Sequence, residues 1–389
     1  MNGLRAVAAT VAVLIVTGAG CSGSAPSGAT HRPASLAASA RVSPCPPARA
    51  VQRRESLRWP TRAVLREGTV EAIADQVVDP AAGAVFLLAS KTNTPVRGPW
   101  VLCRISLTTG AVRLGATFPV GGLTMASGYL WAFSASGARA QPVVSQVDPL
   151  TLQRVRAIRL PSVPANYGGV PVAVTAGPAG SVWIGSDRTL LRVSVSTGRT
   201  LTTVTLPPGL TSGDAAANPA GTTLYVSATS NTAGGMILEY NARTGRKLAA
   251  ASGGVIRYAV AGANLTAVPG GVWASFRTGM MGLTIHLRAR GLPMITPPGP
   301  HVVRSPPTGV FHWPMYATTS FGGGALWVAN ETAIVACLDP RTGAIRASEH
   351  LPLSQLLSEF DAIDPVTRAI FALHYSDLLQ ITPPRRCWH

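Results

Sequence analysis

Short apolar segments with one large aromatic residue at the centre recur along most of the chain. Their spacing is 42 to 54 residues, and stretches rich in Gly, Pro, Ser and Thr separate them. A repeat of about 40 to 50 residues built from strands and turns is typical of a β-propeller, in which each repeat forms one four-stranded blade. The pattern therefore predicts an all-β, seven-bladed β-propeller. The central aromatic residues are Phe86, Trp131, Trp183, Tyr225, Trp273, Trp327 and Phe371.

Two turn motifs accompany these aromatic residues. One begins with Asp-Pro or Asn-Pro seven positions before the aromatic residue, at Asp79, Asn218 and Asp364. The other follows it and has its fullest form, Asp-Pro-Arg-Thr-Gly, at residues 339–343. Asp or Asn opens a turn and Gly tolerates positive φ, so these motifs predict tight turns between the first two strands and between the last two strands of a blade. The fifth repeat keeps only a degenerate second motif, Arg-Ala-Arg-Gly, at residues 288–291.

The seventh repeat lacks a fourth strand, because its last apolar segment is residues 377–381. An uncovered strand edge exposes unpaired backbone groups and invites aggregation. We therefore expect residues 57–66, which include Ala63-Val64-Leu65, to supply a strand and close the ring. Six or eight blades remain the alternative count, because the fifth repeat is degenerate and the N-terminal segment can be assigned differently.

The first residues predict export. Arg5 is followed by an apolar run over residues 6–16 and then by small residues directly before Cys21, which is the order of a secretory signal. The run is too short to span a bilayer. A cysteine at this place resembles the bacterial lipoprotein signal, which implies cleavage before Cys21 and its lipidation, although Gly18 stands where Leu or Val is usual. Simple secretion with Cys21 incidental is the alternative.

This interpretation divides the chain into three parts. Residues 1–20 are the lipoprotein signal peptide, residues 21–55 a disordered tether rich in Ser, Ala and Pro, and residues 56–389 the propeller. The expected location is the outer face of the bacterial cytoplasmic membrane, where the lipid at Cys21 holds a monomer.

The chain is sparsely charged but strongly basic. Charged residues make up 13% of it, and Lys plus Arg outnumber Asp plus Glu by 33 to 16, a formal net charge of +17. This charge fits contact with an anionic surface such as lipid headgroups or a cell-wall polymer. We favour the simpler interpretation, an Arg- and Ala-rich composition of actinobacterial type with arginines scattered over the surface. Nucleic acid is not expected as a partner of an exported chain.

Four cysteines follow Cys21. An even number in an exported domain permits disulfides. Cys45 precedes the closing strand and Cys387 follows the last one, so we predict that Cys45 and Cys387 form a disulfide that staples the closure. The alternative pairs Cys45 with Cys103 and Cys337 with Cys387.

No established catalytic or metal-binding motif occurs in the sequence. Its cysteine spacings do not suggest zinc. Several carboxylates lie singly in predicted loops, so we expect neither a metal site nor a cofactor. These carboxylates are Glu71, Asp75, Asp214, Glu331 and Asp361.

The strongest ligand-binding candidate is the long insertion between the fifth and sixth repeats, residues 297–316. Imidazole, guanidinium and aromatic groups concentrate there in a chain otherwise poor in charge, and long loops on a rigid scaffold often carry function. Covering an apolar blade edge is the alternative role for its aromatic residues. The candidate residues are His301, Arg304, His312, Trp313 and Tyr316.

The Leu-Trp-Val strands followed by Asp-Pro-x-Thr-Gly turns resemble the broad YVTN and NHL-like group of β-propellers. In style the pattern is similar to streptogramin lyase-like propellers, which implies a His general base with Mg²⁺ and makes His301 or His312 the catalytic candidate. Our leading hypothesis is a non-catalytic binding or scaffold module at the cell surface, with a protein, glycan or small molecule as ligand. The alternative is a lyase or hydrolase with its His in the central channel.

Overall fold

The chain divides into two compact units, Met1–Val42 and Ser43–His389, and every described residue belongs to the second. The predicted signal peptide, Cys21 and Cys45 lie outside the described residues. The computed structural model describes residues 53–54, 61–65, 72–90, 100–118, 121–134, 142–161, 172–230, 234–252, 264–278, 281–288, 317–330, 334–351, 357–374 and 377–388.

The described strands form seven antiparallel sheets, six of which consist of consecutive strands. The first sheet contains β3 (Ala72–Asp79), β4 (Ala84–Ser90), β5 (Trp100–Ser106) and β6 (Val112–Phe118), and the second β7 (Gly121–Ala126), β8 (Tyr129–Ser134), β9 (Val143–Val147) and β10 (Arg154–Arg159). The third contains β11 (Val172–Gly177), β12 (Ser181–Ser186), β13 (Thr189–Ser194) and β14 (Thr200–Thr205), and the fourth β15 (Leu210–Ala217), β16 (Thr223–Ser230), β17 (Gly234–Asn241) and β18 (Lys247–Ser252). The fifth contains β19 (Asn264–Val268), β20 (Gly271–Thr278) and β21 (Met281–Arg288), and the sixth β22 (Ala317–Gly322), β23 (Ala325–Asn330), β24 (Ile334–Leu338) and β25 (Ile345–His350).

The remaining sheet joins strands from distant parts of the sequence. Its order is β1 (Arg53–Arg54), β2 (Thr61–Leu65), β28 (Asp377–Ile381), β27 (Ala369–His374) and β26 (Leu357–Asp364). Strand β2 pairs antiparallel with β28, with Thr61 opposite Ile381. A segment from before the first repeat thus extends the sheet of the last repeat.

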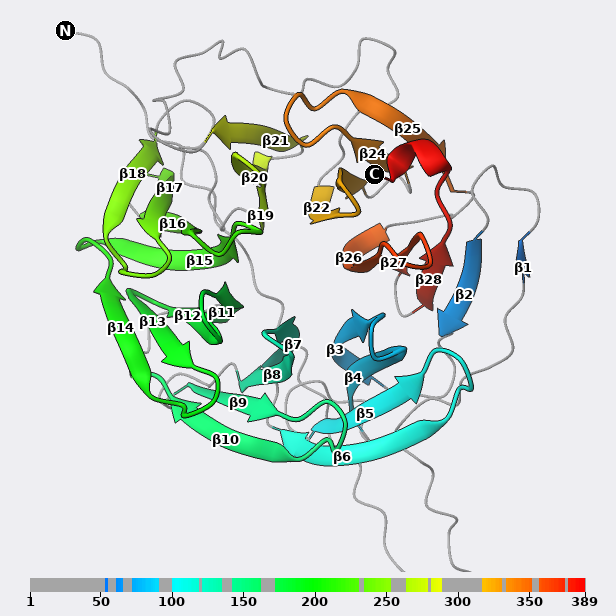
Figure 1. Ribbon diagram of the computed structural model, residues 1–389, viewed down its shortest axis with the longest axis horizontal. Helices are drawn as coiled ribbons and strands as arrows, with labels where there is room; N and C mark the ends of the chain where they lie inside the picture. Colours follow the sequence, from blue (N-terminus) through cyan, green and yellow to red (C-terminus); the bar gives the residue numbers. More distant parts are fainter. Residues whose placement is uncertain are drawn as a thin grey trace, which may run out of the picture. The chain divides into compact units, whose positions relative to one another are not determined.

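The sheets have a propeller-like, all-β arrangement (Figure 1). The first strand of each sheet contacts the first strand of the next, in the order β3, β7, β11, β15, β19, β22 and β26, and β26 contacts β3 again. The first strands lie nearest the centre, and β6, β10, β14, β18 and β25 lie on the outside. The aromatic and apolar side chains fill the space between neighbouring sheets.

The repeated aromatic residues occupy the second strand of every sheet, as the sequence pattern predicts, and all are at most 3% exposed. Large rings at this place contribute apolar contact on both sides of a sheet. Two of them also bond to a turn of the following sheet: Trp183 Nε1 donates to the Ala242 carbonyl at 3.0 Å, and Trp273 Nε1 donates to the Pro340 carbonyl at 2.8 Å.

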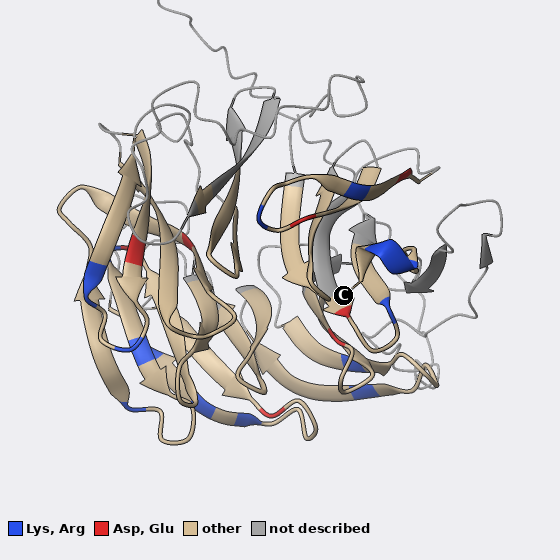
Figure 2. Cartoon of the chain, turned by 45° about the horizontal axis from the view of Figure 1, so that its top comes forward, with Lys and Arg blue, Asp and Glu red and all other residues tan. Residues whose placement is uncertain are grey.

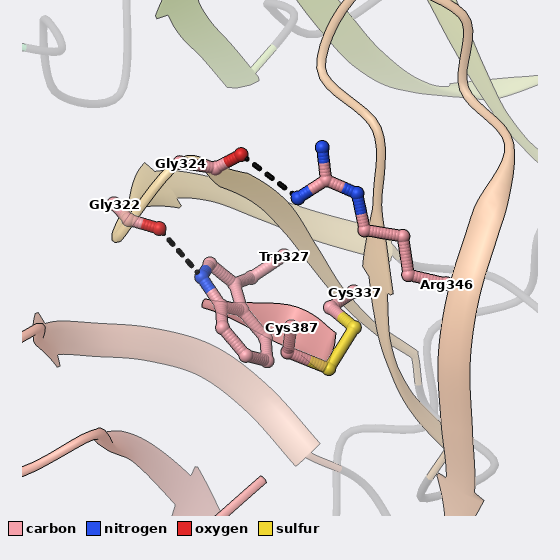
Figure 3. The surroundings of a disulfide bond; sticks show 6 residues. All are labelled: Gly322, Gly324, Trp327, Cys337, Arg346 and Cys387. Carbon is pink, nitrogen blue, oxygen red and sulfur yellow. Dashed lines mark hydrogen bonds between the residues drawn. A yellow bond between two sulfur atoms is a disulfide. The ribbon is translucent and has the colours of Figure 1, made fainter. Parts of the chain in front are cut away.

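The predicted Cys45–Cys387 disulfide is wrong, because Cys387 bonds to Cys337 on β24 (Figure 3). After β28 the chain forms a short 3₁₀ helix, Arg385–Cys387, that contacts β25 of the sixth sheet instead of running toward the N-terminal strands. Trp388 follows it, with its ring centroid 5.0 Å from that of Trp327. Cys103 on β5 is also disulfide-bonded. Of the alternative pairing, the Cys337–Cys387 bond is confirmed. The Cys45–Cys103 bond stays a prediction.

Candidate binding surface

The residues that the sequence singled out for ligand binding or catalysis lie outside the described residues. These are His301, Arg304, His312, Trp313 and Tyr316, which fall between β21 and β22. The described residues instead define one surface in detail. We call it the turn face: it consists of the turns between the first and second strands, the hairpins between the third and fourth strands, and the adjoining ends of the outermost strands.

Backbone hydrogen bonds tie the two kinds of turn together within a sheet. The Leu107 amide donates to the Gly83 carbonyl at 2.8 Å in the first sheet, and the Ala242 amide donates to the Thr222 carbonyl at 2.9 Å in the fourth. Neighbouring sheets also meet here, because Ser127 Oγ donates to the Ser181 carbonyl at 3.0 Å. The two kinds of turn thus lie on the same side of a sheet, and at this junction they meet those of the neighbouring sheet.

The hairpins of the turn face share one internal hydrogen-bond pattern. In the sixth sheet, Asp339 Oδ1 accepts the amides of Arg341 and Thr342 at 3.0 and 2.9 Å, and Gly343 has a φ of 73°. Asn241 plays the same part in the fourth sheet, where Gly245 has a φ of 71°. The turn motifs predicted from the sequence are confirmed, and their carboxylates and amides cap backbone N–H groups.

Asp339 is further bound by Arg346, whose Nη2 lies 2.8 Å from Oδ2. Burial alone would raise the pKa of Asp339, but the Arg346 guanidinium and the turn N–H groups outweigh it and hold that pKa well below its usual range. Arg346 also donates to the Gly324 carbonyl at 3.0 Å (Figure 3). The Asp339 carboxylate therefore belongs to the scaffold.

Several arginines connect one sheet to the hairpin of the next. Arg113 Nη1 donates to the Leu150 carbonyl at 3.1 Å, and Arg156 Nη2 donates to the Ser196 carbonyl at 2.8 Å. Arg192 donates in the same way to the Arg243 carbonyl. These acceptors are neutral, and among the described residues no carboxylate lies within ion-pair distance of these three guanidinium groups. Part of the basic character of the chain thus has a structural role that composition alone did not reveal.

Other cations of the turn face are exposed. Figure 2 shows Lys and Arg along the outermost strands and in the turns, while Asp and Glu occupy fewer positions. Among the described residues, these exposed cations have no carboxylate within ion-pair distance. They are Arg199, Arg243, Arg246, Lys247 and Arg341.

Aliphatic side chains are exposed on the same face. Val366 is 89% exposed in the turn between β26 and β27, and Leu150 is 64% exposed in the hairpin between β9 and β10. The others lie among the first three residues of the outermost strands, after a hairpin. All the large hydrophobic residues that are exposed in the described part of the chain belong to this set: Leu114, Leu150, Val155, Leu201, Leu248, Ile345 and Val366.

Sequence reasoning missed these residues, although a signal for them exists. In four of the repeats an aliphatic residue stands two to four positions after the glycine of the second turn motif, as in Thr-Gly-Arg-Thr-Leu at residues 197–201 and Thr-Gly-Arg-Lys-Leu at residues 244–248. From the sequence alone, such residues indicate only that a strand begins there. Only the structure shows that the strand they begin is outermost and that they point away from the sheet.

One carboxylate lies near the centre of the ring. Asp214 was expected in a loop, but it lies in β15, at a register shift between Ser212 and Ala215, where the bulge turns it toward the next sheet. Its Oδ2 accepts the Leu265 amide of β19 at 2.7 Å. Desolvation raises the pKa of Asp214 to about 6, although the amides of Leu265 and Ala215 oppose the shift. Asp75 and Asp361, also expected in loops, lie in β3 and β26.

Comparison with known proteins supports the fold and identifies no family. No protein-family model matches the sequence, and no curated protein matches it. The solved structure of BamB from Moraxella catarrhalis is similar to this chain, with a TM-score of 0.55 and 14% sequence identity, over 85% of this chain and 95% of that one. At this identity the likeness concerns the propeller fold alone.

Two further observations concern the described residues only. No group of three or more His, Cys, Asp or Glu side chains among them is placed to hold a metal ion. Within the same ranges, the structure contains no helix with the length and apolar character needed to cross a membrane.

Proposed function

We propose that the protein is an exported, lipid-anchored β-propeller that acts as a non-catalytic binding or scaffold module. The observation that carries this proposal is the turn face: its Asp and Asn side chains cap backbone groups, while its cations and aliphatic side chains face solvent. A surface of this kind offers contact area for docking, and its Asp and Asn side chains are already bound to turn amides. This arrangement favours binding over catalysis.

We infer that the ring has seven blades and that β2 closes the last one. The cyclic contacts from β3 through β26 back to β3 support this count. The pairing of β2 with β28 supports the closure, because it covers the edge that β28 would otherwise expose. Covering the outer edge of β28 removes one site for edge-to-edge pairing with a second copy, so we propose a monomer.

The proposed cellular location rests on the N-terminal sequence. We propose that residues 1–20 direct export, that Cys21 carries the lipid, and that residues 21–55 tether the propeller to the outer face of a bacterial cytoplasmic membrane. The protein, glycan or small-molecule partner then meets the propeller outside the cytoplasm. The segment with Arg304, His312, Trp313 and Tyr316 remains our proposed ligand-binding region.

The binding proposal and the lyase or hydrolase alternative differ in what they demand of His301 and His312. We would place a photoreactive amino acid at exposed positions of the propeller in cells and identify adducts by mass, first in the unmodified chain and then in a His301→Ala/His312→Ala variant. A binding module forms an adduct at one confined set of positions and converts no ligand, and the double variant loses adduct only at positions where His312 contacts the ligand. Turnover of a small molecule that disappears in the double variant, while the thermal unfolding midpoint stays the same, would instead establish the enzyme.

A further inference from the structure

The outermost strands expose aliphatic side chains at the end next to the hairpin and polar side chains at the far end. On β14, Leu201 next to the hairpin is 48% exposed, whereas the outward positions farther along the strand are Thr203 and Thr205. On β10 the hairpin end has Val155, 45% exposed, and the far end has Arg159. Single exposed aliphatic residues are common on soluble proteins. Here every such residue in the described part of the chain lies on the turn face, so chance scatter is a poor explanation.

The aliphatic residues alternate with cations around the ring. Leu201 follows Arg199, and Leu248 follows Lys247. The carboxylates of the same face are fewer, and Asp148 and Asp339 accept turn amides through Oδ1. The turn face therefore has a positive potential over several sheets, with one aliphatic side chain projecting from each of most of them.

We propose that the turn face rests on an anionic lipid bilayer. A protein partner uses a contiguous buried cluster as its centre of affinity, but the exposed aliphatic residues are spaced sheet by sheet around the ring. A bilayer is flat and extended, so each residue can enter the headgroup region separately while neighbouring Arg and Lys side chains reach the lipid phosphates.

This inference rests on the proposed function in one respect: export and the lipid at Cys21 bring the propeller to a membrane. It adds an orientation, because the turn face then lies against the lipid and the opposite face, where β10 ends at Arg159 and β22 begins at Ala317, is turned toward solvent. The two proposals fail separately. Loss of the anchor is seen in cell fractionation, and loss of the docking surface is seen with purified protein and vesicles.

The test uses the full chain with Cys21→Ser, purified after export, and vesicles of phosphatidylglycerol or of phosphatidylcholine. Binding to phosphatidylglycerol, weakened by salt, is expected. Modification of arginines by phenylglyoxal, mapped by mass spectrometry, should be slowed by these vesicles at Arg199, Arg243 and Arg341. Arg159, at the opposite end of β10, should react as in solution.

Matched variants sharpen the result. Arg199→Gln and Arg159→Gln remove the same charge from exposed positions, so a general polycation loses affinity equally in both. We expect Arg199→Gln to weaken vesicle binding by about five-fold and Arg159→Gln to change it little. Leu201→Ser should weaken binding and Thr203→Ser, on the same strand, should not. Equal losses in the two arginine variants, equal binding to both lipids, or protection of Arg159 instead of the turn face would overturn the proposal.

Discussion

Two junctions between neighbouring sheets are held by different chemistry. The third and fourth sheets are joined by side chains that bond to backbone carbonyls, Trp183 to Ala242 and Arg192 to Arg243. The sixth and seventh sheets are joined by the Cys337–Cys387 disulfide and the contact of Trp388 with Trp327. Hydrogen bonds of the first kind recur at several junctions, and each contributes little to the free energy of unfolding. The disulfide and the Trp pair stabilise a single junction strongly. We therefore expect unequal losses when the two are broken.

The largest effect should come from the disulfide. Cys337→Ala/Cys387→Ala removes a cross-link that spans 50 residues, which by the chain-entropy argument lowers the free energy of unfolding by about 4 kcal/mol. Urea denaturation of the oxidised parent and the variant measures it. Intact mass shows in the same sample whether the Cys103 disulfide persists. A loss below about 1 kcal/mol would mean that the cross-link is incidental to this junction.

Trp388→Ala should cost somewhat less, about 3 kcal/mol, because it removes a nearly buried ring from the cluster around Trp327. Within the described part of the chain, the Trp388 indole nitrogen has no hydrogen-bond partner. Trp388→Phe should therefore retain most of the stability. Thermal unfolding of the two variants, both with the disulfide intact, distinguishes ring burial from hydrogen bonding. Equal losses would contradict the packing explanation.

A third junction, between the fourth and fifth sheets, responds to pH through Asp214. Its folded pKa, about 6, exceeds the ordinary value of 3.8. Its contribution to stability is therefore fully present below pH 3.8 and is lost as the pH rises through about 6, a change of about 3 kcal/mol. Asp214→Asn should flatten this part of the stability profile. Asp339, whose pKa is shifted in the opposite direction, stays ionised across this window and does not contribute to it.

The smallest effect is expected at the junction between the third and fourth sheets. Trp183→Phe keeps a large ring and removes only the hydrogen bond to the Ala242 carbonyl, so the loss should be about 1 kcal/mol. The same substitution at Trp131, whose indole bonds to Ala126 within its own sheet, is the matched control. Chemical denaturation should give similar losses. A loss at Trp183 as large as that of the disulfide would remove the distinction between the two kinds of junction.

The repeating parts of the fold were predictable from the sequence, and the parts that occur once were not. A buried aromatic residue in each second strand and a Gly with positive φ in four of the described hairpins are local requirements, so they recur at fixed places in the sequence. Even the hairpin without glycine follows the rule, since Leu152 adopts a φ of 61° there. Side chains that join two sheets, such as Arg156 to Ser196, depend on distances that no local pattern records.

The course of the chain after β28 is the clearest case. The Cys45–Cys387 prediction assumed that the last segment stays beside the N-terminal strands. In the structure Trp388 covers Gly323, which has no side chain to obstruct the indole ring. The exposed aliphatic residues of the turn face were missed for a related reason. Whether Leu201 is buried depends on which strand is outermost, and this is a property of the assembled sheet.

The measurement that tests the account most directly is the location of the protein in cells. The unmodified chain should sediment with membranes, and its mature form should begin at Cys21 with the added mass of the lipid. After a high-salt wash, which removes electrostatic docking of the turn face, the Cys21→Ser variant should be found in the medium as folded propeller. A Ser variant that stays with the membranes as firmly as the unmodified chain would contradict the lipid-anchored module.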